Sequence, residues 1–83
     1  MPRAVYYVVS EGQNWRMRSG WHGQESTLYK EVFSTQKAAI RHAVDCAHAE
    51  GKKGNDAQVL VQRDGGQWRT EWTYGNDPYP PVG

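Results

Sequence analysis

Arginines alternate with large apolar residues at positions 15–18, and this is the pattern in the 83-residue chain most suited to binding a ligand. The four residues read Trp-Arg-Met-Arg, and successive side chains of a β-strand point to opposite faces. If Trp and Met face a core, Arg16 and Arg18 point outward together. Positions 67–74 alternate in the same way, which predicts Arg69 on the same outward face.

A sheet face that carries three arginines, an amide and an aromatic ring is suited to binding phosphates and stacked bases. The residues that we expect on this face or at its border are Arg16, Arg18, Arg69, Gln62 and Tyr6, with Lys52 and Lys53 adding charge from a helix end. The alternative is an ordinary solvated face whose arginines pair with acidic residues such as Glu71, because such surface pairs are common and weak. The net charge of +1 gives no general attraction to nucleic acid or to an anionic membrane, so an anion site must be local.

Patterns for catalysis and metal binding are weak. His42 and Cys46 are four residues apart on a predicted helix, but a zinc site needs three or four protein ligands. Cys46 falls in the middle of that helix, without a helix N-terminus to lower its pKa. The acidic residues are scattered singly, and no phosphate-binding glycine loop is present. We therefore expect a protein that is not an enzyme and has no catalytic residue, metal, cofactor or small-molecule substrate.

Two hairpins and one helix are expected to position these residues. Strands are predicted at 5–9, 15–18, 57–62 and 67–74, and 28–33 is suited to a short edge strand. Ser34 or Thr35 is a capping residue for a helix from Gln36 to Glu50, which Gly51 ends. The order β-β-α-β-β predicts an α+β domain with an antiparallel sheet of about four strands and the helix packed on one face.

The predicted helix has a narrow inner face of small residues. Its apolar stripe consists of Ala39, Ile40, Ala43, Val44 and Ala47. A helix with such a face approaches a sheet closely, so large sheet residues must fill the space beside it. We expect Trp15, Trp68 and Trp72 in that space. Trp21, beside a polar loop, is expected to stay outside the core and to be available to a partner.

Proline governs the C-terminal segment, so we divide the chain into a domain at 1–75 and an extended tail at 76–83. Proline fixes its own backbone, lacks a donor and pushes the preceding residue to extended geometry. Asn76 and Asp77 favour a turn, and Tyr79 is the one large side chain beyond it. We expect Tyr79 to pack back on the domain; the alternative is a tail that docks in a partner.

These landmarks resemble a family of small bacterial proteins catalogued as domain of unknown function 2188. The matching residues are Tyr6-Tyr7-Val8-Val9, Trp15-Arg16-Met17-Arg18, Thr35 with Ala38-Ala39, Arg63-Asp64-Gly65 and, most specifically, Tyr74-Gly75-Asn76-Asp77-Pro78-Tyr79-Pro80-Pro81. The chain differs from the family pattern at Gln36 and Lys37, where acidic residues are common. The resemblance implies no catalytic residue, cofactor or partner.

The expected function is that of a binding module. Nucleic acid is the favoured ligand, bound through the outward sheet face. The alternative is a protein partner or a second copy of the chain, bound through exposed aromatic residues, an edge strand or the tail, with Trp21 and Tyr79 as contacts. The lack of a long apolar run argues against a membrane span, and the single cysteine, Cys46, favours the cytoplasm.

Overall fold

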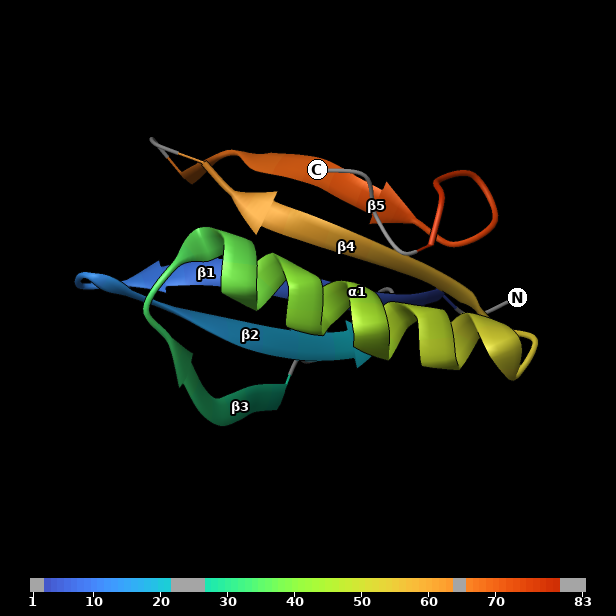
Figure 1. Cartoon of the computed structure of the whole chain (residues 1–83), viewed down its shortest axis with the longest axis horizontal. Helices are drawn as coiled ribbons and strands as arrows, with labels where there is room; N and C mark the ends of the chain where they lie inside the picture. The colour runs from blue at the N-terminus through green and yellow to red at the C-terminus, as the bar shows by residue number, and fades with distance from the viewer. Residues whose placement is uncertain (1–2, 22–26, 64–65, 80–83) are drawn as a thin grey trace.

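A five-stranded sheet carries one long helix across one of its faces (Figure 1). The computed structural model describes residues 3–21, 27–63 and 66–79. In chain order the elements are β1 (Arg3–Glu11), β2 (Asn14–Trp21), β3 (Thr27–Phe33), α1 (Gln36–Lys52), β4 (Asp56–Gln62) and β5 (Trp68–Thr73). The strands lie in the order β3-β2-β1-β4-β5, so β1 is central. The α+β class predicted from the sequence is confirmed.

The sheet is mixed, which corrects the expectation of an antiparallel sheet of about four strands. The edge strand expected at 28–33 is β3, which makes the fifth strand. β1 and β3 both pair antiparallel with β2, whereas β1 and β4 run parallel. The reason is the path of α1. It carries the chain from one edge of the sheet to the far side of β1, and such a crossover connects strands that run in the same direction.

Thr35 starts α1 as a capping residue. Its backbone is extended, with φ −133° and ψ 152°, and its Oγ1 accepts a hydrogen bond from the Ala38 amide at 3.1 Å. The helix ends two residues later than predicted. The Lys53 amide donates to the Glu50 carbonyl at 3.1 Å, and Gly54 follows with a φ of +96°, a conformation that favours glycine.

The core lies between α1 and the sheet, and its helix side is built from small residues. The buried residues in contact there are Ala39, Ala43, Val44 and Ala47 from α1 and Ala4, Tyr6, Val8, Met17, Ala57, Val59, Val61 and Trp72 from the sheet. Trp15 is partly buried beside them. The predicted helix stripe and two of the three predicted core tryptophans are therefore confirmed. Larger side chains from the sheet, Met17 and Trp72 above all, fill the space that the alanines leave.

β5 contains an irregularity that the alternation of its residues does not reveal. Val59 pairs with Trp72, but the next residue of β4, Leu60, pairs with Thr70. Glu71 is therefore an extra residue in β5, as in a β-bulge. A slip of one residue exchanges the faces of all residues on one side of it.

The bulge makes two sequence predictions wrong. Trp68 pairs with Gln62, on the sheet face that points away from α1, and it is 47% exposed rather than in the core. Arg69 pairs with Val61, a core residue, so it lies on the helix side of the sheet and not beside Arg16 and Arg18.

The last turn of α1 lies directly against an aromatic ring that follows β5. Gly51 is buried, and a Cβ at this position would collide with Cγ, Cδ1 and Cε1 of Tyr74. The absence of a side chain at residue 51 is therefore what lets the ring pack there.

We predict that Gly51→Ala destabilises the protein, although alanine normally favours a helix over glycine by about 1 kcal/mol. Overpacking costs about 1–3 kcal/mol, and the displaced atoms belong to the inner part of a ring that cannot swing away freely. Urea unfolding measures the difference. In a Tyr74→Ala background the same substitution should stabilise the protein, because the obstacle is gone. A stabilising effect in the native background would contradict the prediction.

Candidate functional site: the open face of the sheet

The sheet face opposite α1, called here the open face, carries a mixture of apolar, aromatic and basic side chains. Within the described residues no helix covers it (Figure 1). Strand alternation and register assign to it Val5, Tyr7, Val9, Arg16, Arg18, Val32, Gln58, Leu60, Gln62, Trp68 and Thr70. Ala4, Tyr6 and Val8 alternate with the β1 members and pack against α1, which fixes the assignment.

An aromatic pair occupies the middle of the open face. Tyr7, from the central strand, and Trp68, from the edge strand β5, have ring centroids 5.1 Å apart at an interplanar angle of 64°. This is an edge-to-face arrangement. The Trp68 ring therefore reaches across β4 to β1. Tyr7 is half-buried and Trp68 is 47% exposed, so the pair leaves aromatic surface accessible at the centre of the face.

Two arginines of β2 border this pair. Arg18 pairs directly with Tyr7, is exposed, and has no ion pair among the residues that the structure describes. Arg16 pairs with Val9, and its Nη1 lies 3.2 Å from Oε2 of Glu11, with the Arg16 side chain only 20% exposed. Arg18 is therefore the more accessible cation of the two.

Other residues that were predicted on or beside the outward, arginine-bearing sheet face do not lie on the open face. Tyr6 is only 7% exposed and packs in the core, so its predicted place on the outward face is wrong. The reason is the alternation of side chains along β1. Val8 is buried against α1, so Tyr6, two residues before it, lies on the same side, and Tyr7 lies on the open face. Lys52 and Lys53 end α1 in the helix layer and do not extend the open face. The Nζ of Lys53 lies 3.3 Å from Oε1 of Glu50.

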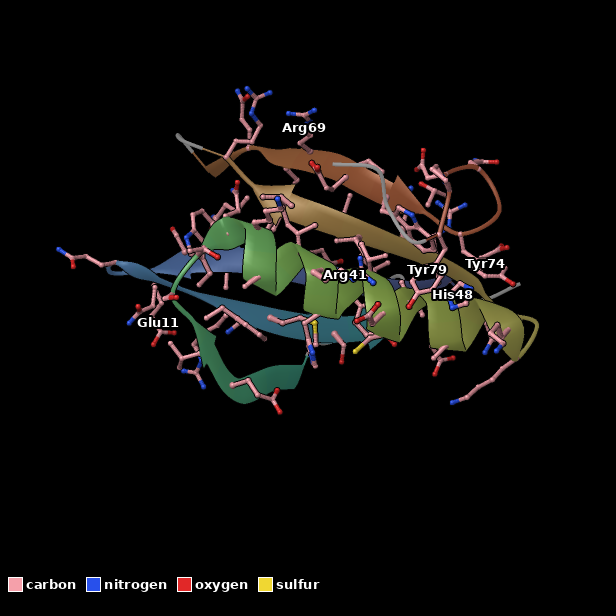
Figure 2. All side chains as sticks on the ribbon, in the orientation of Figure 1. Glu11, Arg41, His48, Arg69, Tyr74 and Tyr79 are labelled. Carbon is pink, nitrogen blue, oxygen red and sulfur yellow. The ribbon has the colours of Figure 1, made fainter. Side chains whose placement is uncertain are left out.

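Arg69 borders a small hollow on the helix side of the sheet. The hollow has a volume of about 210 Å³ and is lined by Trp15, Gln36, Val61, Gln62, Arg63, Arg69 and Glu71. The Nε of Arg69 lies 3.8 Å from Oε2 of Glu71, and Figure 2 shows Arg69 at the outer edge of β5. Arg69 therefore forms the ion pair with Glu71 that is expected if the arginines belong to an ordinary solvated surface.

Cys46 has the environment of a structural thiol. It is half-buried beside the core, and burial raises the pKa of the Cys46 thiol, with further contributions from Asp45 and Glu31. The thiol is therefore protonated at neutral pH, which suits a packing role better than that of a nucleophile. Nearby His42 contacts Phe33, with ring centroids 5.4 Å apart. Among the described residues, no group of three or more His, Cys, Asp or Glu is arranged to hold a metal ion.

A tight turn begins the C-terminal tail. The Asn76 and Asp77 amides donate to the Thr73 carbonyl at 3.2 and 3.1 Å, and Oδ2 of Asp77 accepts from the Thr73 amide at 2.8 Å. Gly75, within the turn, has a φ of +88°. The turn directs the chain from β5 back toward α1.

Tyr79 lies against α1 and contacts three of its side chains (Figure 2). Its hydroxyl donates to Oδ1 of Asp45 at 2.7 Å, and its ring stacks on His48 with centroids 3.7 Å apart and planes 5° apart. Cζ of Arg41 lies 5.8 Å from the ring centroid. The hydrogen bond to Asp45 raises the pKa of the Tyr79 phenol, which keeps the phenol protonated as a donor. Tyr79 was a predicted partner contact, and here its described contacts are intramolecular.

The remaining predicted partner residue is Trp21, which ends β2; its side chain lies outside the described residues. Two residues of the open face, Tyr7 and Trp68, were not predicted. The Tyr6-Tyr7 doublet does carry a signal, because adjacent strand residues point to opposite faces and one ring must face outward. Trp68 has no local signal, because only the bulge at Glu71 turns it outward.

These features define an α+β protein with a helix on one face of a mixed sheet and an aromatic-basic opposite face. The family model described as "Uncharacterized protein conserved in bacteria (DUF2188)" matches residues 6–74, and the chain belongs to this family. The predicted family is confirmed; the match ends before the tail at 76–83. No curated protein and no solved structure matches the chain. Among the described residues, no helix is long and apolar enough to cross a membrane.

We predict that the tail contacts contribute to stability, so that deletion of residues 76–83 lowers the melting temperature. Loss of one contact of ordinary strength shifts the melting temperature of a domain of this size by about 4–8 °C. Tyr79→Ala should reproduce most of the loss, and Tyr79→Phe, which removes only the hydroxyl, should reproduce less. Thermal unfolding followed by circular dichroism measures all three. A deleted protein that melts at the native temperature would contradict a stabilising role.

Proposed function

We propose that the protein is a non-enzymatic binding module that binds single-stranded nucleic acid on the open face. The observation that supports this best is the accessible Tyr7–Trp68 pair beside the exposed Arg18, which has no ion pair among the described residues. Proteins that bind single strands without strong sequence preference combine these two elements, aromatic rings for bases and cations for phosphates. We also propose a cytoplasmic location, because Cys46, the single cysteine of the chain, is free.

Stacking on the aromatic pair would supply most of the affinity. A base stacked on an aromatic side chain contributes about 1–3 kcal/mol, and every base offers a π-face. Gln62 pairs with Trp68 and lies beside the aromatic pair, where its amide can hydrogen-bond the edge of a stacked base. The predicted ligand is therefore a strand with unpaired bases rather than a duplex, whose bases are already stacked on each other.

Electrostatics would contribute modestly. Of the three arginines predicted on the outward face, Arg16 and Arg18 lie on the open face, and Arg16 already pairs with Glu11. For single strands, the logarithm of the binding constant falls with the logarithm of salt concentration by about 0.7 for each neutralised phosphate. Two phosphate contacts give a slope of about −1.4, which is shallow for a nucleic-acid-binding protein.

We predict that Trp68→Ala weakens binding of a fluorescent single-stranded DNA or RNA of about 12 nucleotides by about 1–3 kcal/mol. Trp68→Phe should retain much of the affinity, because it keeps an aromatic face. Arg18→Ala should bring the salt slope from about −1.4 to about −0.7. Fluorescence anisotropy at several salt concentrations measures both effects.

Lys37→Ala is the matched control for Arg18→Ala. Lys37 is exposed on α1, so the substitution removes the same charge from the helix layer and leaves the open face intact. Its affinity and salt slope should equal those of the native protein. No binding at ~50 mM salt, where phosphate contacts are weakly screened, would refute the proposal. So would an equal loss in Lys37→Ala, since binding would then depend on total charge alone.

A second copy of the chain is the alternative occupant of the open face. Val32, on edge strand β3, is 54% exposed and borders Arg16, and Trp68 adds a second exposed apolar residue at the opposite edge. Edge strands also present backbone groups to which another strand can pair. Light scattering over a range of protein concentrations separates the two functions. A dimer that Val32→Lys dissociates, without affinity for nucleic acid, would favour this alternative.

A further inference from the structure

The C-terminal tail contacts a defined set of side chains on α1 and β5. The tail-binding surface consists of Arg41, Asp45 and His48 on α1, and of Trp72 on β5. It lies in the helix layer, away from the open face. The described residues of the tail that meet it are Pro78 and Tyr79.

Each part of the Pro-Tyr unit has its own partner on this surface. Nε1 of Trp72 donates to the carbonyl oxygen of Pro78 at 2.9 Å, although Trp72 itself is only 3% exposed. The tyrosine ring lies flat on His48 and edge-on to Trp72, with the latter ring centroids 6.4 Å apart. The hydroxyl donates to Asp45. The Pro78 carbonyl, the Tyr79 ring and the Tyr79 hydroxyl thus each contact a different side chain.

Aromatic residues hold each other in place behind this surface. Tyr74 contacts both Trp72 and His48, with ring centroids 6.2 and 5.8 Å apart, and Gly51 gives the Tyr74 ring its space. Domains that bind proline-rich peptides likewise hold their ligands in grooves lined by aromatic side chains. Proline keeps such a segment extended in advance, so little entropy is lost on binding.

We propose that the tail-binding surface is a binding site for extended Asp-Pro-Tyr segments of other polypeptides, and that the chain's own residues 77–79 occupy it in competition with them. Asp77 secures the turn that delivers the tail, and Tyr79 remains 41% exposed in place. A segment held this close to the surface opens locally at low cost compared with unfolding of the core. A short tether gives the tail an effective concentration in the millimolar range, which a partner must match or exceed.

The chemistry of the surface also predicts which ligands fail. Asp45 accepts the phenol hydroxyl, so a phosphorylated tyrosine would bring a dianion against a carboxylate. Arg41 also acts on the phenol and lowers its pKa, but less than Asp45 raises it, and the Arg41 guanidinium is already paired with Asp45 at 3.4 Å. The site should therefore bind tyrosine and exclude phosphotyrosine.

The experiment uses the full chain with Tyr79→Ala, which weakens the internal competitor, and a fluorescent peptide that corresponds to residues 76–83. We expect the variant to bind this peptide at least about tenfold more tightly than the native protein, which its own tail blocks. Peptides with alanine or phosphotyrosine in place of the tyrosine should bind at least about tenfold more weakly than the native peptide. Adding His48→Ala to the variant should abolish binding, while adding Lys37→Ala should not.

A second measurement covers the case in which Tyr79→Ala does not fold. Isotope-labelled native protein is titrated with unlabelled peptide to about 10 mM, above the effective concentration of the tethered tail. The amide resonance of Tyr79 should move toward its position in an unstructured chain as the peptide displaces the tail. Absence of displacement at the highest peptide concentration would overturn the proposal, as would a folded Tyr79→Ala protein that binds the native and alanine peptides equally. Neither result depends on nucleic acid binding.

Discussion

Close approach of α1 to the sheet determines most of what the molecule presents to solvent. Three alanines, Val44 and Gly51 form the inner face of the helix, so much of the space beside it is filled from the strands, by Met17 and Trp72. The same lack of side chains admits the Tyr74 ring over the last turn. Trp72 then contacts the tail directly, and Tyr74 packs behind this contact against Trp72 and His48. A larger side chain along this stripe would disturb the core and the tail contacts together.

Much of the fold follows from local patterns in the sequence. The Thr35 cap is a hydrogen bond between residues near in sequence, while the alanine stripe and the alternation in β2 repeat with the period of their own element, so each predicted its element. The parallel pairing of β1 and β4 did not follow, because it depends on where a crossover helix delivers the chain. No periodicity within a strand records the identity of its neighbour in the sheet.

The candidate site was only partly predictable, for a more specific reason. Arg16 and Arg18 lie on the open face because Met17 between them is buried, and an apolar residue flanked by two charges shows this in the sequence. Arg69 and Trp68 exchange faces because one residue, Glu71, is added to β5. The bulge leaves no sign in the alternation of apolar and polar residues. A prediction from that alternation therefore assigns both side chains to the wrong face of the sheet.

The place of β1 has a consequence for how the molecule forms. Arg3 pairs with Asp56, so the centre of the sheet joins segments that are far apart in the sequence. During synthesis the first three strands can associate as they emerge, but β1 keeps one unpaired edge until β4 has been made. Contacts between such distant segments close large loops and slow folding. The exposed edge of β1 in the incomplete chain is therefore the position most open to pairing with another molecule before the native partner arrives.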